Sequence, residues 1–154
     1  MSAYAAPAIR PAMPHEAGMV RGLVRAAYAP WVPVIGREPR PMTADYARAL
    51  REHDIALLEV DGGAVALIET VLRDDHLWIE NVAVRPEHQG RGYGRRLLAH
   101  AECRARAAGR RELRLLTNAA FIANIALYER LGYRINARDD GFGGTVYMRK
   151  TLAQ

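Results

Sequence analysis

Cysteine and lysine are almost absent from this chain of 154 residues, with Cys103 and Lys150 as the single residue of each kind. One cysteine excludes a disulfide framework and a cysteine-rich zinc site within the chain. His76, His88 and His100 do not stand at metal-ligand spacing, and no C-x-x-C pattern occurs. We therefore expect no metal and read Cys103 as a small packing residue.

Long apolar runs are missing as well. No uninterrupted stretch approaches the roughly 20 residues that span a bilayer, so we expect no membrane partner. The segment from Met1 to Pro7 has no basic part followed by an apolar run, so we expect no secretory signal and a cytoplasmic location. Half of the residues are apolar and a quarter are charged. This balance and length predict one globular domain over residues 1–154.

The positive charge comes from arginine. Lys and Arg number 22 against 17 Asp and Glu, a formal net charge of +5. The arginines are spread along the chain with one cluster, formed by Arg85, Arg91, Arg95 and Arg96. A nucleic-acid-binding surface would concentrate basic residues with interleaved aromatics on one face. The cluster favours a small polyanion instead, and we expect no nucleic-acid partner.

Hydrophobic periodicity and turn residues predict a mixed α/β (α+β) fold, with a central sheet flanked by helices. Helices are expected over residues 15–28, 44–50, 94–108 and 119–131, and strands over 8–10, 54–60, 64–72, 76–84, 112–117, 133–136 and 145–152. Asp61-Gly62-Gly63 supplies the positive φ angles of a hairpin turn, so the strands around it should be antiparallel. Gly109 and Gly132 are expected to end two of the helices.

Capping residues and prolines set further boundaries. Thr43 and Asn118 are the expected N-caps of the helices that follow them. The stretch 30–42 contains four prolines, which excludes a regular helix or a central strand there. A glycine-rich loop is expected over residues 140–144, between the last two strands.

The densest signal is the segment 82–98, where a strand ends, glycines alternate at Gly90, Gly92 and Gly94, and a helix begins at once. Glycines let the backbone approach a ligand closely, and a helix N-terminus adds unpaired N–H groups and a positive dipole end. Arg91, Arg95 and Arg96 reinforce this anion cradle. The spacing matches neither the dinucleotide-binding G-x-G-x-x-G motif nor the Walker loop.

The string Val84-x-Pro86-x-x-Gln89-Gly90-x-Gly92-x-Gly94 resembles the Q/R-x-x-G-x-G/A signature of the GNAT superfamily of acyl-CoA N-acyltransferases. The order of elements from Ala8 to Leu152 is similar to that superfamily's fold, with its single, mixed and mostly antiparallel sheet. The resemblance implies that loop N–H groups hold the pyrophosphate of acetyl-CoA and that the preceding strand pairs with the pantetheine arm. The implied cofactor-binding residues are Val82, Ala83, Val84, Gln89, Gly90, Arg91, Gly92, Tyr93, Gly94 and Arg95.

A second signal lies in the helix 119–131, where Phe121, Asn124, Ile125 and Tyr128 fall on one face. From spacing alone, a ligand contact and a satisfied core are equally open for these polar groups. The string N-I-A-L-Y-E-R-L-G-Y is similar to a second GNAT motif. That resemblance implies that Asn124 contacts CoA and that Tyr128 protonates the leaving thiolate. Asn118, after the strand, is expected to meet the same cofactor.

Acyl transfer also needs a base and an oxyanion site. We expect Glu80, just before the cofactor-pairing segment, to act as base through water, and Glu69 on the neighbouring strand is the rival. Backbone N–H groups near Asn81 and Val82 are the expected oxyanion donors.

The predicted function is N-acetylation of a primary amine by direct transfer in a ternary complex. In the resembling fold the Pro-rich stretch borders the acceptor, so Trp31, Arg37 and Tyr46 are the expected substrate-binding residues. This surface has no acidic groove for a lysine-rich tail, which favours a small-molecule acceptor over a protein N-terminus or lysine. A non-catalytic CoA- or nucleotide-binding sensor is the alternative, and the sequence leaves a homodimer open.

Overall fold

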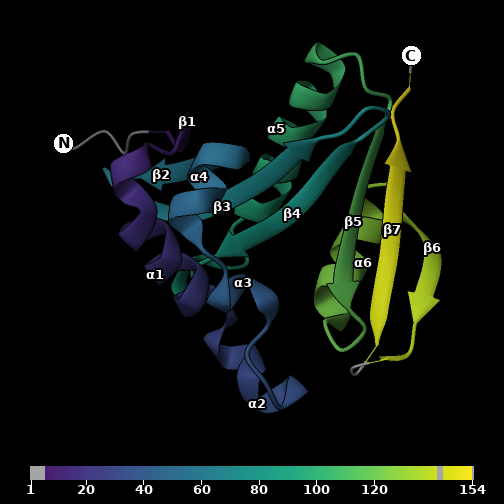
Figure 1. Ribbon diagram of the computed structural model, residues 1–154, viewed down its shortest axis with the longest axis horizontal. Coiled ribbons are helices and arrows are strands. Elements are labelled where there is room, and N and C mark those ends of the chain that lie inside the picture. The colour runs from purple at the N-terminus through teal and green to yellow at the C-terminus, as the bar shows by residue number, and fades with distance from the viewer. Residues whose placement is uncertain (1–5, 142–143, 154) are drawn as a thin grey trace. The chain divides into compact units, whose positions relative to one another are not determined.

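A computed structural model describes residues 6–141 and 144–153. Its strands form one seven-stranded sheet in the order β1-β2-β3-β4-β5-β7-β6 (Figure 1). The strands are mostly antiparallel and helices flank them, which confirms the predicted fold class. Two compact units divide the chain, Met1–Thr70 with Asn81–Leu98 and Val71–Glu80 with Ala99–Gln154. The single domain over residues 1–154 stays a prediction.

The first unit contains most of the helices. Its elements are β1 (Ala8–Pro11), α1 (Ala17–Tyr28), α2 (Val32–Ile35), α3 (Arg40–Thr43), α4 (Tyr46–Glu52) and β2 (Asp54–Val60), most of β3 (Gly63–Leu72), the end of β4 (Leu77–Val84) and the start of α5 (Tyr93–Ala107). Single 3-10 turns occur at Pro14–Glu16, Ala29–Trp31 and Pro86–His88.

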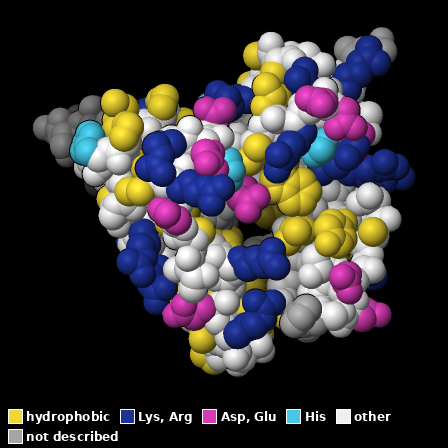
Figure 2. All heavy atoms as spheres, in the orientation of Figure 1, with side chains coloured by type: hydrophobic (Ala, Val, Ile, Leu, Met, Phe, Trp, Pro, Cys, Tyr) yellow, Lys and Arg dark blue, Asp and Glu magenta, His cyan; other side chains and the backbone are white. Residues whose placement is uncertain are grey.

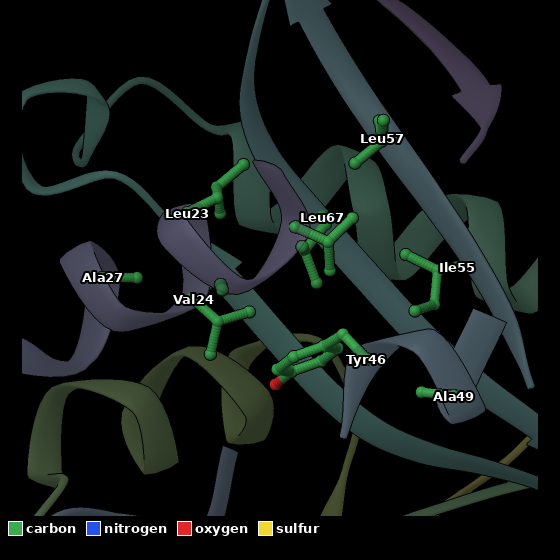
Figure 3. Packing of buried hydrophobic residues seen from close by; sticks show 10 residues of the cluster. Leu23, Val24, Ala27, Tyr46, Ala49, Ile55, Leu57 and Leu67 are labelled. Carbon is green, nitrogen blue, oxygen red and sulfur yellow. The ribbon is translucent and has the colours of Figure 1, made fainter. Parts of the chain in front are cut away.

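The core of this unit lies between α1, α4 and the sheet. α1 directs the buried side chains of Leu23 and Val24 toward Leu67 of β3 and Tyr46 of α4 (Figure 3). Burial of each large apolar side chain contributes about 1.5–3 kcal/mol. The apolar spacing that predicted a helix over 15–28 therefore marks the face that packs inward.

The Pro-rich stretch forms short helices, where the sequence predicted no regular helix. Pro33 and Pro41 stand in the first turns of α2 and α3. Proline is tolerated there because the first N–H groups of a helix have no partner within it. Gly36 ends α2 with a φ of +76°. The prolines therefore break the stretch into single turns and do not exclude helix altogether.

The predicted N-cap of the next helix is wrong. Thr43 is the last residue of α3, and Asp45 caps α4 by accepting a hydrogen bond from the Arg48 N–H at 3.1 Å. The hairpin turn is confirmed, because Asp61 and Gly62 both have positive φ, +53° and +82°, and β2 pairs with β3 antiparallel.

The second unit comprises the start of β4, the later part of α5, β5 (Glu112–Asn118), α6 (Ile122–Arg130), β6 (Arg134–Asp139) and β7 (Thr145–Thr151). β4 and β5 are parallel and paired from Leu77↔Leu113 to Ile79↔Leu115. β7 lies between β5 and β6 and is antiparallel to both. α6 lies behind β5 and β7 in the view of Figure 1.

Two expectations about α6 have opposite outcomes. Asn118 is not its N-cap, because its side-chain oxygen accepts from the Ala120 N–H at 2.8 Å and closes a turn before the helix. Gly132 does end the helix, with a φ of +97° and a hydrogen bond from its N–H to Glu129 O at 3.1 Å.

The glycine-rich loop predicted over 140–144 includes Phe142 and Gly143, which lie outside the described residues. Within the part of the chain that the structure describes, no helix is both long and apolar enough to cross a bilayer.

Candidate active site

The glycine turn takes the predicted form. Gly90 and Gly92 have φ angles of +78° and +82°, and α5 begins at Tyr93. A Cβ atom built on either glycine would meet nothing within 4 Å. The backbone conformation therefore requires glycine, and the space beside the turn is open for a ligand. Gly94 lies inside the first turn of α5, so the third glycine belongs to the helix.

Backbone N–H groups at this turn are available to a ligand. Among the hydrogen bonds of the described residues, none is donated by the N–H groups of Gly90, Arg91, Gly92, Tyr93, Gly94 or Arg95. The first paired N–H of α5 is that of Arg96, which bonds to Gly92 O at 3.1 Å. Successive unpaired N–H groups at a helix N-terminus form an anion-binding concavity.

Side chains around the turn divide into two groups. Arg91, Arg95 and Arg96 are exposed, and the Arg96 Nη2 donates to Pro7 O at 3.4 Å. Arg85 does not join them, because its Nε donates to Ala64 O at 3.2 Å and fixes the end of β4 to β3. Gln89 donates from Nε2 to Val84 O at 3.2 Å and stabilises the loop itself. Within the described residues, Arg91 and Arg95 are therefore the members of the predicted cluster whose side chains have no hydrogen-bond partner.

The end of β4 offers its backbone to a ligand. Ala83 is buried in the core, whereas Val82 and Val84 are half-buried. The Tyr28 hydroxyl donates to Asn81 Oδ1 at 2.8 Å and lies 3.3 Å from Val82 O. Asn81 in turn donates from Nδ2 to the Tyr46 hydroxyl at 3.4 Å. Tyr28 and Asn81 therefore hold this strand segment in place, a role that sequence reasoning did not assign to Tyr28.

The predicted substrate-binding residues differ in exposure. Arg37 is exposed and Trp31 is half-buried. Tyr46 lies in the core at 3% exposure, with its hydroxyl 2.6 Å from Pro41 O. Contact of these three residues with an acceptor stays a prediction.

In the second unit, α6 positions Asn124 and Tyr128. Asn124 is half-buried, and Tyr128 is 9% exposed. Burial raises the pKa of the Tyr128 phenol to about 12, so the phenol keeps its proton at neutral pH. Its ring packs edge-on against that of Tyr133, with centroids 5.7 Å apart. The Tyr133 hydroxyl is buried without a partner among the described residues, and burial raises its pKa as well.

The two candidate bases have different surroundings. Glu80 is exposed and accepts a hydrogen bond from Trp78 Nε1 at 2.7 Å. Glu69 is 4% exposed, and its Oε2 lies 2.6 Å from His53 Nδ1. Glu80 is thus the more accessible carboxylate. Sequence reasoning did not assign Trp78 as the hydrogen-bond partner of Glu80. The signal was present, because residues two apart on a strand share a face.

Within residues 6–141 and 144–153, no three His, Cys, Asp or Glu side chains lie together as a metal ion would require.

Comparison with known proteins shows which family the chain resembles in sequence and in fold. The family model described as "Acetyltransferase (GNAT) family" matches residues 21–133. Among curated proteins, none matches the sequence. Solved structures do match in fold. The ribosomal-protein-S18-alanine N-acetyltransferase from Escherichia coli has a TM-score of 0.80 at 23% identity, over 97% of this chain and 96% of that one.

Two further structures contain the coenzyme. The paia N-acetyltransferase from Thermoplasma acidophilum, in complex with coenzyme A, has a TM-score of 0.80 at 16% identity over 96% of this chain and 100% of that one. A GNAT family acetyltransferase from Elizabethkingia anophelis with acetyl-CoA bound has a TM-score of 0.69 at 17% identity over 95% and 98%. At these identities the likeness concerns the fold.

Proposed function

The chain belongs to the GNAT acetyltransferase family, and on that premise we propose that it transfers an acetyl group from acetyl-CoA to a primary amine. The transfer is direct, within a ternary complex of the protein, acetyl-CoA and the amine. The acceptor is a small molecule, and the reaction takes place in the cytoplasm.

The observation that carries this proposal is the turn from Gly90 to Arg95. Its unpaired N–H groups, its two glycines of positive φ and the exposed Arg91 and Arg95 fit a pyrophosphate, which offers several charged oxygens to nearby donors. Two neighbours in fold have CoA or acetyl-CoA in their structures, which supports the same choice of ligand. Asn118 and Asn124 are also proposed to contact the cofactor.

The chemistry follows from three groups. The amine nitrogen forms a bond to the acetyl carbonyl carbon, and the carbon–sulfur bond breaks. Glu80 takes the proton that the amine loses, through a water molecule, and Tyr128 supplies a proton to the departing sulfur. The N–H groups of Asn81 and Val82 stabilise the negative charge on the carbonyl oxygen. The position of Asn81 between two tyrosines supports this role, because it fixes the backbone.

Tyr128 fits the role of proton donor through its protonation state. With a pKa of about 12, it remains a neutral phenol across the physiological range and can donate as the thiolate forms. Glu80 fits the role of base through its exposure, which lets water reach the carboxylate. Glu69 remains the rival base, but its contact with His53 Nδ1 and its burial separate it from water.

The test has two steps. Calorimetric titration with acetyl-CoA measures binding, and release of free CoA thiol in the presence of an amine panel measures transfer. We expect tight binding and CoA release with at least one small amine. Binding without release under any amine, including peptides with free N-termini and lysine side chains, would identify a CoA sensor in place of an enzyme.

A further inference from the structure

Three arginines form a row across the sheet of the second unit. The strand register places Arg114 of β5 opposite Arg149 of β7, and Arg149 opposite Arg134 of β6. Paired residues of neighbouring strands point to the same face of a sheet, so the three side chains share one face. Lys150, the next residue of β7, points to the other face, where it forms an ion pair with Glu102 of α5.

Two of the three arginines lack an ion-pair partner in the part of the chain that the structure describes. Arg114 is paired with Glu112 at 2.6 Å and with Asp75 at 3.4 Å. Arg149 and Arg134 are exposed, and neither has an ion pair or a side-chain hydrogen bond within the described residues. Like charges directly opposite one another on adjacent strands destabilise a sheet. An anion beside Arg149 and Arg134 would relieve this repulsion.

Apolar side chains adjoin the row on the same face. Leu116 of β5 stands opposite Tyr147 of β7, and Tyr147 stands opposite Ala137 of β6. Leu116 is 48% exposed, and Tyr147 is half-buried. Figure 2 shows apolar side chains over β5, β7 and β6 next to a band of Lys and Arg side chains. The face thus combines an apolar floor with a cationic border.

The candidate base lies on this face too. Trp78 of β4 pairs with Arg114, so it continues the row onto a fourth strand. Glu80, two residues further along β4, points the same way and is held by the Trp78 indole N–H. Where β4 is paired with β5, up to Ile79, two strand spacings separate β4 from β7, about 10 Å, which a molecule with one aromatic ring can bridge.

From this arrangement we infer that the acceptor is an amine that also carries a carboxylate at the far end of an apolar body. The amine lies at Glu80, the apolar body packs on Leu116 and Tyr147, and the carboxylate binds Arg149 with Arg134. Guanidinium groups bind carboxylates through paired hydrogen bonds, which gives this row its selectivity. The inference rests on the proposed function and names the substrate class of that site.

The choice of a small acceptor follows from the limited extent of the charge. Arg114 is already neutralised by its own carboxylates, so only Arg149 and Arg134 remain to bind an anion. One carboxylate satisfies that pair, whereas an acidic peptide would bring several charges. A second copy of this chain is a poor occupant, because the net charge is +5.

The test compares two acceptors of equal shape, para-(aminoethyl)benzoate and para-(aminoethyl)benzamide, by their rates of CoA release. We expect the wild-type kcat/KM to be higher for the benzoate by about tenfold or more. One additional charge-assisted hydrogen bond to the carboxylate accounts for a difference of this size. In Arg149→Gln the two values should become nearly equal. High salt should also reduce the wild-type preference, since exposed charges are screened.

Arg138→Gln is the matched control. Arg138 is exposed on the same edge strand, but its register partner is the buried Val146, so it points to the opposite face. This variant removes the same charge and should keep the preference for the benzoate. Loss of the preference in both variants would show that net charge alone produces it and would overturn the inference.

Other outcomes are equally decisive. Equal rates for the two acceptors in the wild type, or an unchanged preference in Arg149→Gln, would overturn the inference. Acetyl-CoA binding without transfer to either acceptor would overturn it too, while other amines could still support the proposed function. A higher kcat/KM for an Asp- and Glu-rich peptide than for the benzoate would assign the row to a protein acceptor.

Failure of the proposed function has a different signature. If calorimetry detects no acetyl-CoA binding, the acceptor assay has no meaning, and the row is tested by itself with para-ethylbenzoate and para-ethylbenzamide. Chemical-shift changes at Arg149 and Tyr147 with the benzoate, lost in Arg149→Gln, would support an anion site. Their absence would overturn it.

Discussion

Replacement of Gly92 by alanine separates a conformational cost from a binding cost. Gly92 has a φ of +82°, and an added Cβ would meet no protein atom within 4 Å. The only cost within the protein is that of a left-handed residue, about 1–2 kcal/mol. For a chain of this length that cost lowers Tm by about 3–6 °C. The methyl group would nevertheless occupy open space at the turn that carries the unpaired N–H groups, where we propose that the pyrophosphate binds.

The expected loss of affinity is larger than the loss of stability. If the methyl group removes two hydrogen bonds to a charged phosphate, at about 1.5 kcal/mol each, the binding free energy falls by about 3 kcal/mol. This corresponds to a loss of about a hundredfold in affinity for acetyl-CoA. Calorimetric titration measures the affinity, and thermal unfolding without ligand measures the stability of the same preparation.

Gly109 provides the control at the other end of α5. Its φ is +71°, and an added Cβ would likewise meet nothing within 4 Å. Gly109→Ala should therefore lower Tm by a similar amount and leave acetyl-CoA affinity unchanged. Wild-type affinity in Gly92→Ala, or equal losses of affinity in both variants, would refute the assignment of the turn as the pyrophosphate site.

The remaining predictions concern catalysis, acceptor binding and stability. Tyr128→Phe keeps the ring that packs on Tyr133, so acetyl-CoA affinity should persist. Turnover, measured by CoA release, should fall about a hundredfold because the proton donor is lost. Unchanged turnover would make Tyr128 a packing residue. Because the pKa of Tyr128 is about 12, its ionisation should not produce an alkaline decline in kcat below about pH 11. Trp31→Ala should raise the acceptor KM and preserve acetyl-CoA affinity. A variant that binds neither the acceptor nor acetyl-CoA, or that unfolds, would show that Trp31 has a structural role. Hydrogen bonds from Arg10 and the Met13 N–H lower the pKa of Glu16 to about 2. The stabilisation from Glu16 should thus be complete above about pH 4.5 and disappear as pH falls through about 2, and the Tm difference from Glu16→Gln should follow this course.

Turn chemistry made much of the fold readable from the sequence. Gly109 and Gly132 have the positive φ that a helix-ending glycine implies, and Gly90 and Gly92 of the predicted turn have it too, since few other residues adopt that conformation without strain. Amphipathic spacing likewise located α1 and its buried Leu23. Signals of this kind depend on the chain within a few residues.

Choices between neighbouring capping residues were not readable. Thr43 and Asp45 are both good N-caps, but Thr43 is the last residue of α3, which leaves the cap of α4 to Asp45. Asn118 has the same capping chemistry but is used in a turn.

Contacts distant in sequence were also out of reach. The arginine row depends on the register of three strands, and β7 separates two strands that precede it in the chain. The support of Asn81 by Tyr28 joins residues 53 positions apart. Periodicity reports which face of a strand is buried, but it does not report which strands are neighbours.

The position of β7 has a consequence for biosynthesis. β5 and β6 leave the ribosome before β7, yet each hydrogen-bonds to β7 and not to the other. Until Thr145–Thr151 emerges, both strands have an unpaired edge toward the missing neighbour, and such edges are templates for aggregation. The last strand therefore enters between two strands already made, and this half of the sheet cannot assemble in the order of translation. A nascent chain stalled before Thr145 should be a preferred client of ribosome-associated chaperones.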